Sequence, residues 1–169
     1  EAAGGSVDRR LLIRLNPAIE FKTRGNAALC LETDLDPARA FDLAVDAIDD
    51  LAEVADPRTD PGVVVADATA ETVSDDVAAF ARRALHDRID PSEAGTLLDR
   101  LNYRHEGGRG RIGALAAVGA DRAFDDWTYE RIAYRELDRC GTPRDVDSES
   151  AFAAAQAAYP DAWDTVGRE

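Results

Sequence analysis

The sequence of 169 residues contains no methionine, a single lysine, two cysteines and no long apolar run. An apolar stretch of about 20 residues is needed to span a bilayer, so a membrane-spanning helix is excluded and no membrane partner is expected. Cys30 and Cys140 are far apart and outside any metal-ligand spacing, which argues against a disulfide framework and a zinc site. We expect Cys30 to be buried in a strand and Cys140 to be structurally neutral. Without an initiator methionine, the chain is expected to be a piece of a longer protein.

Basic residues are also scarce. The net charge is −14, from 34 Asp+Glu against 20 Lys+Arg, and every fixed cation except Lys22 is arginine. Such a surface stays hydrated in concentrated salt, where a Debye length of about 3 Å at 1 M screens self-repulsion. The composition therefore predicts a cytoplasmic protein of a salt-loving microbe. Acidity normally argues against nucleic-acid partners, but in such a proteome clustered arginines carry more information than the net charge.

Apolar periodicity and turn residues predict strands mixed with helices. Strands are expected at residues 10–15, 27–33, 63–65 and 127–135. Helices are expected after Asp36-Pro37, through 73–85, after Asp90-Pro91, after the glycines near 110, and from 148 or 150 to 159. We expect the helix after Asp36 to pack on the first two strands, and strand 63–65 to be buried. Because strands and helices do not alternate strictly, we predict an α+β fold with a mixed sheet and helices packed on one side of it.

The stretch 106–120 joins a glycine-rich turn to an Ala- and Leu-rich helix. Its glycines fit the pattern G-x-G-x-x-G, but no convincing hydrophobic strand leads into them, and no Gly-Lys-Ser/Thr follows. Glycines let backbone N–H groups come close to a ligand, and the N-terminus of the following helix aims at the same point. With Arg109 and Arg111, this arrangement favours a phosphate site. The alternative is a flexible, arginine-bearing loop before an ordinary buried helix. The glycines are Gly108, Gly110 and Gly113.

A second polar loop lies between strands 10–15 and 27–33. It places two cations, a hydroxyl, a flexible hinge and an amide in five consecutive residues. The only lysine of the chain lies here, and a compact ammonium group suits a phosphate oxygen. The alternative is a polar hairpin turn with incidental charges. The residues are Lys22, Thr23, Arg24, Gly25 and Asn26.

Other polar side chains are weaker candidates. His86 and His105 are expected to cap or pack, since neither has a carboxylate at a meaningful spacing. Asp60 and Asp67 could reach a metal, but in so acidic a chain we favour solvated surface carboxylates. No metal ligands are therefore assigned within the chain.

These motifs occur in a fixed order. They are Leu15-Asn16-Pro17, Lys22-Thr23-Arg24-Gly25-Asn26-Ala27, Asp60-Pro61-Gly62, the run 108–120, and Tyr129-Glu130-Arg131-Ile132-Ala133-Tyr134-Arg135. In them the chain resembles the archaeal tRNA(Ile) 2-agmatinylcytidine synthetase family, from residue 10 to about 163. The resemblance implies part of an ATP-binding kinase-like domain over residues 1–105. Residues 106–169 would then hold the glycine-rich loop, its helix and the start of a ferredoxin-like domain.

The resemblance also implies an activity. Members of this family are ATP-dependent ligases that join agmatine to C2 of the wobble cytidine, C34, in the CAU anticodon of tRNA(Ile). The C2 oxygen of the cytidine is first phosphorylated, which turns it into a leaving group. The agmatine amine then displaces that group. The expected cofactors are ATP and Mg²⁺, and the expected partners are tRNA(Ile) and agmatine. Lys22 and Arg24 would contact ATP phosphates or the RNA backbone, and Asn26 would form a hydrogen bond nearby. The two loops would form two walls of one phosphate site: Lys22, Thr23, Arg24, Gly25 and Asn26 on one side, Gly108, Arg109, Gly110 and Arg111 on the other.

The chain departs from the family pattern at both ends. The family's Asp-Asp-Thr-Asp stretch, which supplies metal-binding carboxylates, and its phosphorylated Thr loop would precede Glu1. The later agmatine-binding segments, the OB-fold and the zinc ribbon are also absent. We therefore expect the Mg²⁺ ligands upstream, assign no catalytic residue, and expect no turnover from these residues alone. The alternative is a non-catalytic RNA- or nucleotide-binding module that retains the fold.

Overall fold

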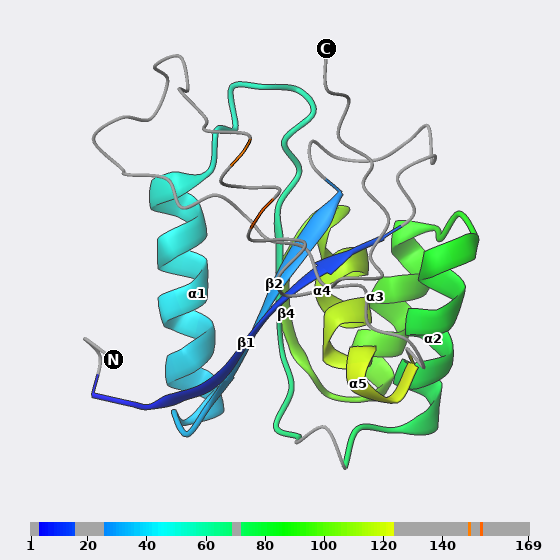
Figure 1. Ribbon diagram of the computed structural model, residues 1–169, viewed down its shortest axis with the longest axis horizontal. Helices are drawn as coiled ribbons and strands as arrows, with labels where there is room; N and C mark the ends of the chain where they lie inside the picture. Colours follow the sequence, from blue (N-terminus) through cyan, green and yellow to red (C-terminus); the bar gives the residue numbers. More distant parts are fainter. Residues whose placement is uncertain (1–3, 16–25, 69–71, 124–148, 150–152, 154–169) are drawn as a thin grey trace. The chain divides into compact units, whose positions relative to one another are not determined.

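The computed structural model describes residues 4–15, 26–68, 72–123, 149 and 153 (Figure 1). The helices and strands are β1 (Val7–Arg14), β2 (Ala27–Thr33), α1 (Pro37–Leu51), β3 (Gly62–Val65), α2 (Asp75–His86), α3 (Pro91–Arg100), β4 (Arg104–Gly107), α4 (Gly110–Val118) and α5 (Ala120–Ala123). The chain divides into two compact units, Glu1–Asp126 and Trp127–Glu169, and all these elements belong to the first. The predicted strand 127–135 and the last predicted helix fall almost entirely outside the described residues.

The described strands form two antiparallel pairs. In the first pair, β1 and β2 place Leu12 opposite Leu29. In the second pair, β3 and β4 place Gly62 opposite Gly107. The predicted α+β class is confirmed, with two short ladders in the described residues where we expected one mixed sheet. None of the helices in the described ranges combines the length and apolar character that a bilayer crossing requires.

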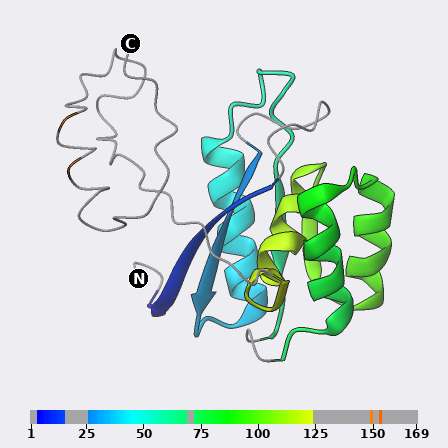
Figure 2. The same cartoon turned by 45° about the vertical axis from the view of Figure 1, so that its right-hand side comes forward.

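Helix α4 is the element around which the first unit is built. It contacts α2, α3 and α5 on one side, and all four strands β1 to β4 on the other (Figures 1 and 2). Leu115, Ala116 and Ala117 are buried. A helix contacted on several sides needs apolar residues around most of its circumference, which the Ala- and Leu-rich run supplies. The helix predicted to follow the glycine-rich turn is therefore confirmed.

Helices α2 and α3 form the well-packed side of α4. Ser74 caps α2, and its side chain accepts a hydrogen bond from the backbone N–H of Val77. Asp90 caps α3, with Pro91 at its first position, as the sequence predicts. Val77 and Leu98 are both fully buried, at 0% exposure. Burying an apolar side chain of this size stabilises the fold by about 1.5–3 kcal/mol.

Helix α1 begins as predicted but packs elsewhere than predicted. The Asp36 carboxylate accepts hydrogen bonds from the N–H groups of Ala38 at 3.0 Å and Arg39 at 3.2 Å. The helix then packs against β3 and β4, so the prediction that it covers the first two strands was wrong. None of its residues is buried. Strand β3 and Cys30 are likewise half-buried, where we expected burial.

The sequence predicted no strand before the glycine-rich turn, and this was also wrong. Strand β4 runs directly into that turn. Its sequence, Arg-His-Glu-Gly, has no apolar alternation, and its residues are exposed or half-exposed. Pairing with β3 makes it a strand, because β-propensity is easily overridden by tertiary context.

Candidate functional site

The glycine-rich turn is bonded to a second turn of the protein. The N–H of Gly108 donates to the Pro61 carbonyl at 2.8 Å, and the N–H of Gly110 donates to the Asp60 carbonyl at 2.9 Å. Between them, the N–H of Arg109 donates to Oδ2 of Asp60 at 2.9 Å. The backbone donors that the sequence directed toward a ligand are thus engaged with the Asp60-Pro61 turn.

Close approach of these two turns explains the glycines. A Cβ at Gly108 would collide with the Asp60 carboxylate, and a Cβ at Gly110 would collide with the backbone of Gly62. Gly107 has φ +91°, a conformation that side chains disfavour. The glycines were predicted to let a ligand come close; the structure shows that they let the Asp60-Pro61 turn come close, and the ligand stays a prediction.

Asp60 has a structural role that the sequence did not reveal. It is exposed, as expected of a surface carboxylate, yet its side chain lies at the N-terminus of α4. Arg109 is the residue directly before the helix, and its side chain forms no capping hydrogen bond with the first turn. A carboxylate at a helix N-terminus satisfies a free N–H group and opposes the positive end of the helix dipole. Asp60 therefore acts as a cap supplied from a distant turn.

A hydrogen-bonded chain joins α3, β4 and α4. His105 Nε2 lies 2.9 Å from Asp99 Oδ1, and His105 Nδ1 lies 3.1 Å from Arg111 Nη1. A guanidinium can only donate, so in this arrangement Nδ1 is the acceptor from Arg111 and Nε2 is the nitrogen that faces the Asp99 carboxylate. Arg111 Nε also donates to the Gly108 carbonyl at 3.2 Å. Arg111 is therefore held against the protein from two sides.

The expectation that His105 has no suitable carboxylate was wrong. Asp99 lies six residues earlier, near the end of α3, and the turn between α3 and β4 brings it back. Asn102 in that turn has φ 55°, a left-handed conformation that asparagine tolerates. His86, the last residue of α2, is exposed, as expected for a residue at a helix end.

The described ends of the two predicted loops lie close together. Lys22, Thr23, Arg24 and Gly25 lie outside the described residues, so the structure does not test them. Asn26 is described: it has φ 42°, and its carbonyl accepts from the Leu15 N–H at 3.3 Å, which closes the β1–β2 ladder.

A contact between β2 and α4 brings these loop ends together. A Cβ at Gly113, in the first turns of α4, would lie 3.5 Å from the Ala28 Cβ of β2. Ala28 lies just after Asn26, and Gly113 lies just after the glycine-rich turn. Both loops are thus anchored at the same part of the molecule.

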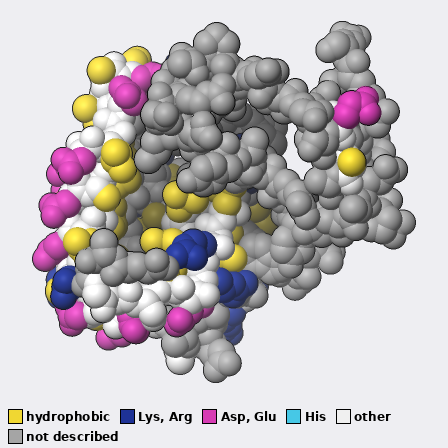
Figure 3. All heavy atoms as spheres, turned by 60° about the vertical axis from the view of Figure 1, so that its left-hand side comes forward, with side chains coloured by type: hydrophobic (Ala, Val, Ile, Leu, Met, Phe, Trp, Pro, Cys, Tyr) yellow, Lys and Arg dark blue, Asp and Glu magenta, His cyan; other side chains and the backbone are white. Residues whose placement is uncertain are grey.

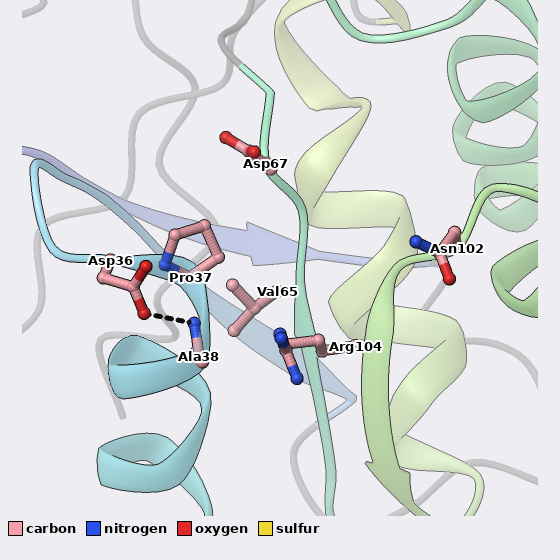
Figure 4. A pocket seen from close by; sticks show the side chains of 7 residues that line it. All are labelled: Asp36, Pro37, Ala38, Val65, Asp67, Asn102 and Arg104. Carbon is pink, nitrogen blue, oxygen red and sulfur yellow. Dashed lines mark hydrogen bonds between the residues drawn. The ribbon is translucent and has the colours of Figure 1, made fainter.

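A pocket of about 280 Å³ lies at the far end of the β3–β4 pair (Figure 4). Val65 pairs with Arg104 there, whereas Gly62 pairs with Gly107 beside the glycine-rich turn, so the two places lie at opposite ends of the ladder. Figure 4 shows the Asp36 carboxylate turned to the N-terminus of α1, where it bonds Ala38. The lining residues are Asp36, Pro37, Ala38, Val65, Asp67, Asn102 and Arg104.

Metal ligands are not clustered in the part of the chain that the structure describes. No group of three or more His, Cys, Asp or Glu residues there is arranged to hold an ion. Asp67 lines the pocket, with Asp36 as the second carboxylate, and Asp36 is occupied as a helix cap. Mg²⁺ prefers several oxygen ligands in octahedral geometry, which these residues do not offer.

Comparisons with known proteins bear on these features. A family model described as the TiaS FLD domain matches residues 108–169. The 2-agmatinylcytidine synthetase TiaS of Haloquadratum walsbyi is 53% identical over 173 residues, which cover 100% of this chain and 37% of that protein. The chain belongs to the TiaS family. A second TiaS, from Methanosarcina mazei, is 42% identical over 92% of this chain and 38% of its own length, so the chain spans 37–38% of these curated relatives.

Solved TiaS structures share the fold. The crystal structure of apo TiaS superposes with a TM-score of 0.80 at 37% identity, covering 97% of this chain and 39% of that one. A TiaS complex with tRNA and ATP gives 0.75 at 38% identity, covering 95% and 39%. The family predicted from the sequence motifs is therefore confirmed. The division at residues 105 and 106 into kinase-like and ferredoxin-like parts stays a prediction.

Proposed function

We propose that this chain is part of an ATP-dependent ligase that joins agmatine to C2 of C34 in tRNA(Ile) with the CAU anticodon. The name of the TiaS relatives and the solved TiaS complex with tRNA and ATP support this proposal. Because the chain spans 37–38% of these relatives, the activity belongs to a longer protein. Mg²⁺ held by residues outside this chain, and a cytoplasmic location in a salt-loving archaeon, are parts of the same proposal.

We place an ATP phosphate contact at the two predicted loops, whose ends lie close together. The observation that carries this placement is the packing of Gly113 against Ala28, which anchors both loops at one part of the first unit. A cradle of cations and small residues would position a phosphoryl group and neutralise its charge. The proposed residues are Lys22, Thr23, Arg24, Gly25 and Asn26 from one loop, and Gly108, Arg109, Gly110 and Arg111 from the other.

The two arginines of the second loop make different contacts with the protein. Arg111 is tied to His105 and to the Gly108 carbonyl. Arg109 is exposed, and its backbone is fixed by Asp60. Both arginines therefore belong to the proposed cradle, and Arg111 also supports the turn.

Binding measurements on the longer enzyme test this site. Lys22→Ala and Arg109→Ala are each expected to weaken ATP binding by about 1–3 kcal/mol, the scale for losing a charge-assisted contact, or roughly 5- to 150-fold in Kd. Arg58→Ala is the control, because Arg58 is an exposed arginine already paired with Asp56. Wild-type ATP and tRNA affinity in both loop variants would contradict the placement.

A non-catalytic nucleotide- or RNA-binding module is the second candidate. It is favoured by the engagement of the glycine-turn N–H groups with Asp60 and Pro61, which leaves the turn fewer donors for a reacting phosphate. Agmatine incorporation into tRNA separates the two. Incorporation by the longer protein supports the ligase, whereas tRNA binding without incorporation supports the module.

A further inference from the structure

The peptide group between Gly108 and Arg109 is held from both sides. Its carbonyl accepts hydrogen bonds from Arg111, from the side-chain Nε at 3.2 Å and from the backbone N–H at 3.2 Å. Its N–H donates to Asp60 Oδ2 at 2.9 Å. Because a peptide group is planar and its C=O and N–H point in opposite directions, these bonds fix the backbone from which the Arg109 side chain starts.

The Arg111 side chain that bonds this peptide group is itself enclosed. Its guanidinium lies against α3, where a Cβ at Gly95 would come 3.7 Å from Nη1. Its Cγ lies against β3, where a Cβ at Gly62 would come 2.8 Å from it and collide. The course of the side chain toward the Gly108 carbonyl is therefore set by α3 and β3.

His105 closes the enclosure from β4. Its Nδ1 lies 3.1 Å from Arg111 Nη1, and its Nε2 lies 2.9 Å from Asp99 Oδ1. The His105 side chain is 19% exposed. Since the guanidinium can only donate, the acceptor at Nδ1 determines how the guanidinium plane is turned. His105 is thus the group that orients Arg111.

A phosphate has to be held on a strongly acidic protein. The net charge of the chain is −14. On the face drawn in Figure 3, carboxylates recur over the described surface, whereas basic side chains gather in a few small groups. A broad positive field does not attract the ligand here, so cations that are fixed in place before binding matter more.

We propose that His105 is a positioning residue of the phosphate site formed by the two loops. It holds the Arg111 guanidinium so that Nε reaches the Gly108 carbonyl, and thereby keeps the glycine-rich turn in place before the phosphates of ATP bind. Within the described residues, the two side-chain bonds of Arg111 use two of its five N–H groups, which leaves donors for a phosphate oxygen. The inference rests on the proposed function, because His105 acts on ATP only if this turn contacts phosphate.

Two amide variants separate the two nitrogens of His105. The oxygen of asparagine is attached to Cγ, as Nδ1 is in histidine, so His105→Asn keeps an acceptor for Arg111 and loses the bond to Asp99. The amide of glutamine reaches the position of Nε2, so His105→Gln keeps the bond to Asp99 and loses the acceptor for Arg111. The control is His86→Gln, at the other histidine of the chain, which is exposed at the end of α2.

Binding of ATP and of adenosine to the longer enzyme is the readout. We expect His105→Gln to raise the Kd for ATP by about 3- to 10-fold, and His105→Asn and the control to stay within about 2-fold of the parent. Adenosine carries no phosphate and should bind all these proteins alike. Arg111→Lys, which keeps the charge but has no Nε–H, should show the same loss for ATP alone.

Three results would overturn the positioning role. They are an unchanged Kd for ATP in His105→Gln, an equal loss in His105→Asn, and an equal loss for adenosine, since a merely structural role would affect both variants and both ligands. Unfolding midpoints measured in urea show whether each variant is folded.

Failure of this proposal can be distinguished from failure of the phosphate site. If Lys22→Ala and Arg109→Ala weaken ATP binding but His105→Gln does not, the site stands and the positioning role is wrong. If neither loop variant weakens ATP binding, the phosphate site lies elsewhere, and the role of His105 is wrong with it.

Discussion

The two sides of helix α4 differ in how completely they are packed. On the helical side, where α2, α3 and α5 pack against α4, three large side chains are each 0% exposed. They are Val77 of α2, Leu98 of α3 and Leu115 of α4. On the outer layer of the sheet side, α1 has no buried residue, and Leu29 and Leu31 of β2 are exposed. The helical side is therefore closed by residues of this chain, whereas the far face of the β1–β2 pair carries exposed leucines in the part of the chain that the structure describes. Four predictions test this difference, from the largest expected effect to the smallest.

Truncation of a leucine should separate the two sides most clearly. Leu115→Ala leaves a cavity inside the closed side, and we expect a loss of about 2–5 kcal/mol in the free energy of unfolding. Leu31→Ala removes an exposed side chain, and the change in this chain should stay within about 0.5 kcal/mol. Urea unfolding of the two variants measures both values. Similar losses would mean that the open face is already covered within the chain.

Two glycine-to-alanine changes test the tightness of the helical side. A Cβ at Gly119 would lie 2.7 Å from the Val77 carbonyl oxygen, so Gly119→Ala must push α4 away from α2. We expect a loss of about 1–3 kcal/mol, typical of overpacking. Gly95→Ala is the control, since its nearest neighbour would be Arg111 Nη1 at 3.7 Å.

The control should behave in the opposite direction. Gly95 lies inside α3, where alanine is favoured over glycine by roughly 0.5–1 kcal/mol. The two melting temperatures should therefore move apart, with Gly119→Ala lower and Gly95→Ala higher than the parent. A stabilised Gly119→Ala variant would show that the two helices can separate at no cost.

The cap supplied by Asp60 should have an intermediate effect. Asp60→Ala removes the acceptor for the Arg109 N–H at the start of α4, and we expect a loss of about 1 kcal/mol, as for other N-cap residues. Asp67→Ala, at another exposed aspartate, is the control. Equal unfolding midpoints for these two variants would exclude a capping role for Asp60.

The smallest effect should be a pH dependence at the start of α3. Hydrogen bonds from the Ser92 side chain and backbone N–H lower the pKa of Asp90. Because the folded pKa lies below the unfolded value of about 3.9, the stabilisation is present above that value and lost as the pH falls through the folded pKa. Asp90→Asn keeps a capping side chain without a charge, so its unfolding midpoint should vary less below pH 4 or so. Parallel curves for both proteins would remove Asp90 as a source of acid sensitivity.

Much of the fold is readable from local signals. Asp36-Pro37 and Asp90-Pro91 mark the starts of α1 and α3, and both caps form as predicted. The apolar run after Gly110 predicts the central helix α4. Strand β4 was not predicted because its residues are polar, and it is a strand only through its pairing with β3.

The candidate site was less predictable, since its contacts join residues far apart in sequence. The glycines at 108 and 110 indicate a close approach, but the sequence does not say whether a ligand or a protein segment approaches. Here Asp60 and Pro61 do so, across a separation of 49 residues for Asp60 and Arg109. The pairing of His105 with Asp99 likewise depends on a turn whose path no local pattern specifies.

The amino-acid order alone determined the family, the α+β class and the helix starts, whereas the phosphate site at the two loops stays a prediction. These are local properties: caps, periodicity, turn residues and ordered motifs act over a few residues. The tertiary structure decided which segment fills the glycine-rich turn, which strands α1 covers, and which leucines stay exposed. Those outcomes depend on packing between distant segments, where shape and hydrogen-bond partners are chosen only once the chain has folded.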